Sequence, residues 1–246
     1  PLCQIAYASG MDGGRMRFKV LFPGGRHTVI YGAPELLKDV ADVEIAEKVL
    51  SEEELVERIR GVDAVVAAMG RYPRSMFEAA DRLKIIAMYG VGYDPIDVKA
   101  ATEKGVYVTR APLVNVESLA EHCVCMMIVL ARRIMLAETE FRKGNWNIRY
   151  GPLLYATEIQ GKILGIIGLG GVGSRLAQRA KCFEMRILGC DPYIPKDGFV
   201  ELGVEEADLE RLLKKSDFVS VNCLLTPETR GLLNEERLKM MKSTSY

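Results

Sequence analysis

The feature that most constrains this sequence is a glycine-rich run, Gly168–Gly173 (GLGGVG), that directly follows the apolar segment Ile163–Ile167. The apolar segment has the length of a buried strand, and an amphipathic helical pattern follows the glycines. In such a unit, the first glycine permits a tight turn, Gly170 lets backbone N–H groups approach a pyrophosphate, and Gly173 lets the helix pack closely on the strand. The pattern predicts a dinucleotide-binding fold that begins near Gly161.

Asp191 lies where a dinucleotide-binding fold has an acidic residue that binds the adenosine ribose. Asp191 follows the apolar run Arg186–Cys190 and comes 18 residues after Gly173, close to the expected spacing of ~20. Its carboxylate can accept hydrogen bonds from both ribose hydroxyls of an adenosine, and it would repel the 2′-phosphate of NADP. Pro192 and Tyr193 follow, so no Arg stands there to hold that phosphate. The sequence therefore predicts NAD as the cofactor.

Upstream of the glycine run, short apolar segments alternate with helical patterns. One expected helix begins at Ser51 and carries Glu54 three residues later, which are the residues of a capping box. Strands that alternate with helices are typical of a parallel sheet, because each parallel connection must cross over the sheet. The expected strands are Phe18–Phe22, Ala64–Met69, Lys84–Tyr89 and Val106–Thr109.

A second alternating series surrounds the glycine run. Its expected strands are Lys162–Ile167, Arg186–Cys190 and Phe218–Val221, and its expected helices are Val172–Phe183, Asp208–Lys215 and Asn234–Met241. Residues Lys242–Tyr246 lie where a further strand should start. A six-stranded dinucleotide fold would then be incomplete, with an exposed strand edge and exposed apolar surface. We expect an incomplete record of a longer polypeptide, rather than a fragment that hides this surface in a partner.

The stretch between the two series predicts one long helix. Residues Asn115–Lys143 contain no Pro or Gly, and their apolar residues recur at spacings of three and four. The segment Gly144–Tyr155, which contains Gly, Asn and Pro, then breaks this pattern. We place the domain boundary at the start of the helix, with a first domain over residues 1–114 and a second over residues 115–246.

Composition excludes several classes of function. The 33 basic and 33 acidic residues give a net charge of zero, which provides no long-range attraction to nucleic acid or anionic membranes. The apolar run Cys123–Ala131 is too short to span a bilayer, which takes ~20 residues. The six cysteines never show CxxC spacing, so we expect reduced core residues and no metal site. The start, PLCQIAYASG, lacks a secretory signal, which favours the cytoplasm, and its first residue, Pro rather than Met, suggests processing or a fragment.

Four ordered blocks of sequence together point to one family. They are Leu83–Asp97 (LKIIAMYGVGYDPID), Asn115–His122 (NVESLAEH), Gly161–Gly170 (GKILGIIGLG) and Asn222–Gly231 (NCLLTPETRG). Together they resemble the D-isomer-specific 2-hydroxyacid dehydrogenases, the family that includes D-3-phosphoglycerate dehydrogenase and glyoxylate/hydroxypyruvate reductase. The resemblance implies an α/β fold of two doubly wound parallel-sheet domains. A flavodoxin-like substrate domain would come first, and a Rossmann NAD-binding domain, incomplete at the C-terminus, would follow.

The resemblance also implies a reaction and a set of site residues. Such an enzyme transfers a hydride between NAD(H) and a small D-2-hydroxy acid or 2-oxo acid, in a cleft between its domains. The turn Gly90-Val91-Gly92 would offer N–H groups to the substrate carboxylate, as a small anion nest, and Arg71 is a further candidate for an anionic substrate. The residues implied to contact the cofactor are Gly171, Val172, Asn222, Cys223 and Thr229. Cys223 departs from the small or hydroxyl residue expected there, which limits it to a backbone or packing contact.

The residues that would move the proton are not found within the sequence. The family uses a His base, tuned by a carboxylate, and an Arg that holds the substrate, and all three positions fall beyond Tyr246. His122 is expected to be a partly buried, hydrogen-bonded helix residue, and His27 a solvated loop residue. We therefore predict no catalytic residue in this chain.

Other interpretations remain open at this point. A methyltransferase also uses a strand, a glycine turn and an acid, but it would leave the first domain unexplained. An NAD(H)-sensing interaction protein, similar to the relatives that act in transcriptional co-repression, would bind the dinucleotide but would not turn over a substrate. An inactive fragment is a further alternative. The family resemblance further implies a homodimer through the 115–143 region, where Met126, Met127 and Met135 would suit an adaptable apolar surface.

Overall fold

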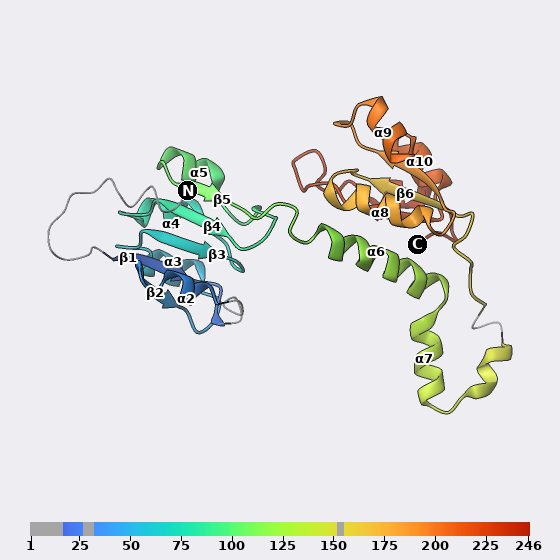
Figure 1. Cartoon of the computed structure of the whole chain (residues 1–246), viewed down its shortest axis with the longest axis horizontal. Coiled ribbons are helices and arrows are strands. Elements are labelled where there is room, and N and C mark those ends of the chain that lie inside the picture. The colour runs from blue at the N-terminus through green and yellow to red at the C-terminus, as the bar shows by residue number, and fades with distance from the viewer. Residues whose placement is uncertain (1–16, 27–31, 152–154) are drawn as a thin grey trace. The chain divides into compact units, whose positions relative to one another are not determined.

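The computed structural model describes residues 17–26, 32–151 and 155–246 (Figure 1). His27 and Cys3 lie outside the described residues. The chain forms two compact units, Pro1–Pro112 and Leu113–Tyr246, and each is described by itself.

The first unit contains a five-stranded parallel sheet. Its strands are β1 (Phe18–Phe22), β2 (Ala41–Ile45), β3 (Ala64–Ala67), β4 (Ile85–Met88) and β5 (Tyr107–Thr109). They lie in the order β2-β1-β3-β4-β5, which is the order of flavodoxin-like folds. This confirms the expected fold class. The strand β2 was not expected, because its sequence, ADVEI, has only two bulky apolar residues to mark it.

Helices cover both faces of this first sheet. They are α2 (Ala33–Leu37), α3 (Glu52–Arg58), α4 (Arg74–Ala79) and α5 (Val98–Glu103). The helix α3 begins with the expected capping box, in which the Ser51 side chain accepts from Glu54 N–H and the Glu54 carboxylate accepts from Ser51 N–H. Residues of α3, α4 and α5 pack with Leu21, Val65 and Ile86 in one cluster, while α2 covers Val20 and Phe22 on the other face. The sheet is thus buried on both sides, as parallel sheets are.

The second unit contains a four-stranded parallel sheet. Its strands are β6 (Ile163–Ile167), β7 (Arg186–Cys190), β8 (Glu205–Glu206) and β9 (Phe218–Val221), in the order β8-β7-β6-β9. Counted from the start of this unit the order is 3-2-1-4, as in the first part of a Rossmann fold. The backbone of Tyr246 pairs with the free edge of β9, since Val219 N–H donates to Tyr246 O and Tyr246 N–H donates to Asp217 O, both at 2.9 Å.

Helices also lie on both faces of the second sheet (Figure 1). Residues of α6 (Val116–Ala131), α8 (Gly171–Lys181) and α9 (Lys196–Leu202) pack with Leu164 and Ile166. On the opposite face, α10 (Leu209–Lys215) places Leu212 and Leu213 against Ile167 and Leu188, and α11 (Glu235–Met240) follows. The side chains of β6 therefore alternate between two apolar clusters, which fixes the strand at the centre of the unit.

The prediction of one long helix over Asn115–Lys143 is wrong. The helix α6 ends at Ala131, and a second helix, α7 (Ile134–Arg142), starts after Arg133, whose backbone is left-handed (φ 52°). A 3₁₀ helix, η2 (Trp146–Tyr150), follows α7. The break has no Gly or Pro to mark it, so the apolar spacing continues through it in the sequence.

The prediction that the cysteines are core residues is also wrong for those that the structure describes. Their thiols are free, as expected, but Cys125 and Cys182 are exposed and Cys123, Cys190 and Cys223 are half-buried. Each lies at the rim of an apolar cluster or on a helix surface rather than inside it. Within the described ranges, no helix is both long and apolar enough to cross a bilayer.

Candidate functional site

The glycine turn after β6 is held between two neighbouring strands. Gly168 N–H donates to Cys190 O at 2.9 Å, and its φ of 89° lies in the region that favours glycine. A Cβ at Gly168 would lie 2.6 Å from Cys223 N, so the backbone after β9 presses directly against the turn. The ends of β6, β7 and β9 are thereby brought to one point.

The helix after the turn starts against the strand. A Cβ at Gly173 would lie 2.0 Å from Gly168 O, so only glycine allows α8 to begin this close to β6. Space around Gly170 is open, and α8 starts at Gly171 without a side-chain cap on its first N–H groups. The N–H groups of a first helical turn lack helical acceptors and carry partial positive charge. Gly170, Gly171 and Val172 therefore form a strand-to-helix turn that can hold an anion such as a pyrophosphate.

Asp191 stands at the end of β7 beside this turn. Its Oδ2 accepts from Leu169 N–H at 2.8 Å, and its Oδ1 accepts from Tyr193 N–H at 2.9 Å. These two bonds fix the carboxylate next to the glycine turn, while the residue remains half-buried. A carboxylate has about four acceptor positions, so each oxygen can still accept from a sugar hydroxyl. The residues present fit a dinucleotide, with the diphosphate at α8 and a ribose at Asp191.

Of the predicted cofactor residues after β9, Asn222 and Cys223 lie against the glycine turn or its strand, and Thr229 does not. Asn222 N–H donates to Ile167 O at 2.7 Å, and its Nδ2 donates to Ser220 Oγ at 3.0 Å. Cys223 lies against Gly168 through its backbone. The Thr229 hydroxyl donates to Leu224 O at 2.6 Å and thus closes its own loop, and no described contact joins it to the glycine turn.

A second turn, in the first unit, carries the candidate substrate residues. Gly90 follows β4 with a φ of 149°, and its carbonyl accepts from Ala111 N–H at 2.9 Å. The Val91 carbonyl accepts from the Arg110 guanidinium at 3.3 Å, and that guanidinium lies 5.5 Å from the centre of the Tyr93 ring. Arg110 was missed in the sequence. It directly follows β5, and the adjacent ends of parallel strands meet at one edge, which is the signal that could have found it.

Arg71 lies on the loop after β3, at the same edge of the first sheet. Its neighbour Tyr72 is buried and pairs with the segment after β4, since Tyr72 N–H donates to Pro95 O at 2.9 Å. Burial raises the pKa of Tyr72 to about 12, and its neutral hydroxyl donates to Met69 O while it accepts from Ala68 N–H. The loop is thus anchored beside Arg71, whose own side chain is exposed and meets no described acidic partner.

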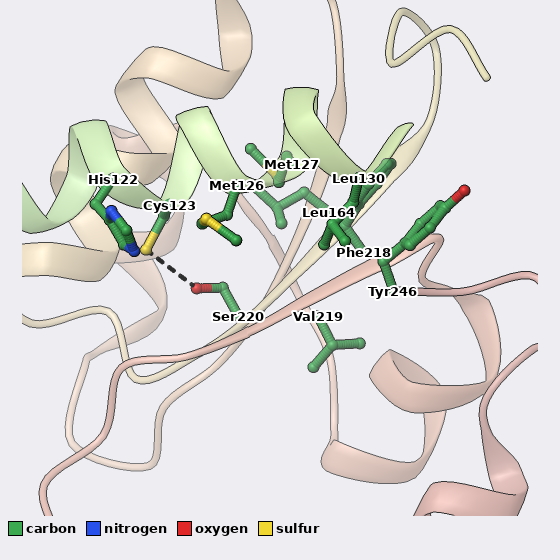
Figure 2. Close-up of a pocket in the computed structure, with 10 residues that line it drawn as sticks. All are labelled: His122, Cys123, Met126, Met127, Leu130, Leu164, Phe218, Val219, Ser220 and Tyr246. Atoms are coloured by element: carbon green, nitrogen blue, oxygen red, sulfur yellow. Dashed lines mark hydrogen bonds between the residues drawn. The ribbon is translucent and has the colours of Figure 1, made fainter. Parts of the chain in front are cut away.

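A hollow of about 170 Å³ lies between α6 and β9 in the second unit (Figure 2). His122, Cys123 and Met126 line it from α6, and the Ser220 hydroxyl donates to Cys123 Sγ at 3.8 Å. Its other lining residues are Met127, Leu130, Leu164, Phe218, Val219 and Tyr246. The expectation that His122 is partly buried and hydrogen-bonded is wrong: the residue is exposed, and none of the described side chains bonds to it. A general base of this type is normally oriented by a carboxylate, so we assign His122 no catalytic role.

Comparisons with known proteins agree with this geometry. Residues 124–246 match the model of the D-isomer specific 2-hydroxyacid dehydrogenase, NAD binding domain. A glyoxylate reductase of Korarchaeum cryptofilum is 42% identical over 197 residues, which cover 79% of this chain and 59% of that protein. A D-3-phosphoglycerate dehydrogenase of Methanocaldococcus jannaschii is 40% identical over 215 residues, or 87% of this chain and 40% of that protein.

A solved structure has the same arrangement of elements. The D-lactate dehydrogenase of Aquifex aeolicus, complexed with NAD and lactic acid, superposes with a TM-score of 0.81 at 28% identity, and the match covers 91% of this chain and 66% of that one. The chain spans only 40–59% of the length of the two curated relatives. The family model covers the glycine turn, and the matches to the two relatives extend into the preceding unit, which the methyltransferase alternative left unexplained. The chain belongs to the D-isomer specific 2-hydroxyacid dehydrogenase family.

Proposed function

We propose that this chain forms the substrate domain and most of the NAD-binding domain of a D-2-hydroxyacid dehydrogenase. The enzyme transfers a hydride between NAD(H) and a small D-2-hydroxy acid or its 2-oxo acid. The observation that carries this proposal is the junction of the glycine turn with Asp191, whose carboxylate accepts from Leu169 N–H at 2.8 Å. The family match and the shared fold of an NAD-bound D-lactate dehydrogenase support it.

The proposed cofactor is NAD. In this assignment the first turn of α8 holds the diphosphate, Asp191 holds the adenosine ribose, and Asn222, Cys223 and Thr229 border the remaining rim. A 2′-phosphate would meet the negative charge of Asp191, and the next side chains are those of Pro192 and Tyr193 rather than a cation. When bound, the nicotinamide supplies the hydride chemistry, so the chain has to bind and orient rather than carry electrons.

The proposed site for the substrate carboxylate is the Gly90-Val91-Gly92 turn, with Arg71 on the neighbouring loop. Successive backbone N–H groups at such a turn form a concavity that suits an anion. We assign no acid or base to any residue of this chain, because neither His122 nor His27 lies in one of these two turns. Reduction of a 2-oxo acid also takes one proton, and we name no donor for it among the described residues.

We also propose a homodimer through the 115–143 region, in a cytoplasmic protein. The helix α7 buries none of its residues, and its Ile134, Met135 and Phe141 are 42%, 64% and 39% exposed. Met126 is exposed as well, whereas Met127 is buried in the core and is removed from the proposed surface. Large apolar side chains gathered on an uncovered helix favour a protein contact. Sedimentation should show a dimer, and Met135→Glu should shift it to the monomer mass.

The test of the function is oxidation of NADH by the natural full-length protein. Glyoxylate, hydroxypyruvate and pyruvate are added separately with NADH, and absorbance at the NADH band is followed. We expect one of them to oxidise NADH, and a slower rate with NADPH because of Asp191. Silence across a wide panel of 2-oxo acids would contradict the enzyme assignment.

A second candidate function is an NAD(H)-sensing interaction protein. It is favoured by one observation: the glycine turn and Asp191 meet at the start of α8, while no described His lies at either turn. It predicts NADH binding without turnover, and partner binding that changes with NADH. If NADH does not bind at all, both functions are wrong.

A further inference from the structure

The segment after β5 bonds to the Gly90–Gly92 turn at two successive peptide groups. Ala111 N–H donates to Gly90 O at 2.9 Å, and the Arg110 guanidinium donates to Val91 O at 3.3 Å. The same guanidinium lies over the Tyr93 ring, 5.5 Å from its centre. Two adjacent carbonyls of one turn are thus held by two successive residues of the segment after β5.

This arrangement decides where the N–H groups of the turn point. In a trans peptide the C=O and the following N–H point in opposite directions. Because Gly90 O and Val91 O both face the segment after β5, the N–H groups of Val91 and Gly92 face away from it. Neither N–H donates to another group in the described part of the chain. The turn therefore has two successive N–H groups without a described acceptor, and an anion nest is built from such groups.

The charge on Arg110 is not used in an ion pair with any described residue. Three other arginines of the first unit are paired, Arg58 with Glu44, Arg74 with Glu103, and Arg82 with Asp63, whereas Arg60 and Arg71 have no described acidic partner. Arg110 instead contacts a ring face and a carbonyl oxygen. The ring contact and the hydrogen bond both favour this position of the guanidinium. It can hold the Val91 peptide while it keeps a positive charge beside the nest.

We propose that Arg110 is a positioning residue that orients the Val91 and Gly92 N–H groups toward the carboxylate of a 2-oxo acid. The proposal rests on the function proposed above and adds a residue to its substrate site. Arg110 does not touch the reacting atoms. It acts through the peptide between Val91 and Gly92, and Tyr93 keeps its guanidinium in place.

The test compares Arg110→Ala with a matched control, Arg60→Ala. Arg60 is exposed, has no acidic partner among the described residues, and lies before β3, at the opposite end of the same sheet. Both variants lose one positive charge from the first unit, so general charge effects are shared. With the natural full-length protein, we expect Arg110→Ala to raise the KM for the 2-oxo acid about tenfold, which corresponds to the loss of one hydrogen bond and one cation–π contact. We expect kcat and the Kd for NADH to change by less than about twofold.

Two further readouts separate positioning from a general structural role. Arg110→Lys keeps a donor and the charge, and should restore KM to within about threefold of the unaltered protein. In ¹⁵N-labelled protein, oxalate should shift the amide signals of Val91 and Gly92, and Arg110→Ala should abolish that shift but Arg60→Ala should not. A KM and an oxalate response equal to those of Arg60→Ala would overturn the proposal while the function stands. If the unaltered protein neither reduces a 2-oxo acid nor responds to oxalate, the proposed function itself is wrong.

Discussion

Removal of the Asp191 carboxylate should weaken NADH binding by an amount that follows from its bonds. Each oxygen already accepts one backbone N–H, from Leu169 and from Tyr193, and this leaves each free to accept one ribose hydroxyl. Because the residue is only half-buried, we take about 1 kcal/mol for each of the two bonds. Asp191→Ala should therefore cost about 2 kcal/mol, or raise the Kd for NADH about 30-fold. The Kd for NADPH should stay the same or fall, because the repulsion of its 2′-phosphate is lost.

The assay is a titration of NADH and NADPH into the full chain, followed by the fluorescence of the bound nicotinamide. Asp197→Ala is the matched control, since Asp197 is an exposed acid on α9, six residues along the chain. Thermal unfolding of each variant checks that the loss of two backbone acceptors has not opened the fold. Equal affinity of Asp191→Ala and Asp197→Ala for NADH would refute the placement of the ribose at Asp191.

Two predictions concern stability. Gly168→Ala should lower the free energy of unfolding, measured in urea, by at least about 2 kcal/mol, because the φ of Gly168 is 89° and an added Cβ would press on Cys223. Gly161→Ala is the control: its backbone is also left-handed but an added Cβ meets open space, so it should cost about 1 kcal/mol. Burial raises the pKa of Asp217, but the Lys242 ammonium and the Ile163 N–H together lower it by more than burial raises it. The pKa of Asp217 in the folded state is therefore below its usual value. Because the pKa is lower in the folded than in the unfolded protein, ionised Asp217 stabilises the fold at pH values above the unfolded pKa near 3.8. This stabilisation is lost as the pH falls through the pKa of the folded protein. Asp217→Asn should thus be less stable by about 1–2 kcal/mol at pH 7, and equal stability loss at pH 7 and pH 2 would contradict this reasoning.

The sheets and the dinucleotide turn could be predicted because their signals are local. The segment Ile163–Ile167 is apolar at every bulky position, and β6 is buried on both faces. Gly168 and Gly173 are required by contacts of 2.6 and 2.0 Å that a Cβ would make, and such needs appear directly as glycine in the sequence. The alternation of strand and helix predicted parallel sheets, whereas the fold of each domain was implied only by the family resemblance.

The features that were missed depend on contacts between distant residues. The helix ends at Ala131 because Arg133 adopts a left-handed conformation, for which the residues at this position give no local signal. Arg110 contacts Val91, nineteen positions away, and a lone Arg after a strand has the same sequence appearance whether it is solvated or holds a turn. The cysteines were expected in the core because they lie in apolar segments, but Cys125 and Cys182 are exposed and Cys123, Cys190 and Cys223 are half-buried.

We propose that the full-length protein transfers a hydride between NAD(H) and a D-2-hydroxy acid, and an isotope label on the cofactor can follow that hydride into the product. The natural full-length protein is incubated with NADH carrying two deuterium atoms at nicotinamide C4 and with the 2-oxo acid that the panel selects. We predict one deuterium at C2 of the product, and the product should be the D isomer. A product without deuterium at C2, or the L isomer, would contradict the account.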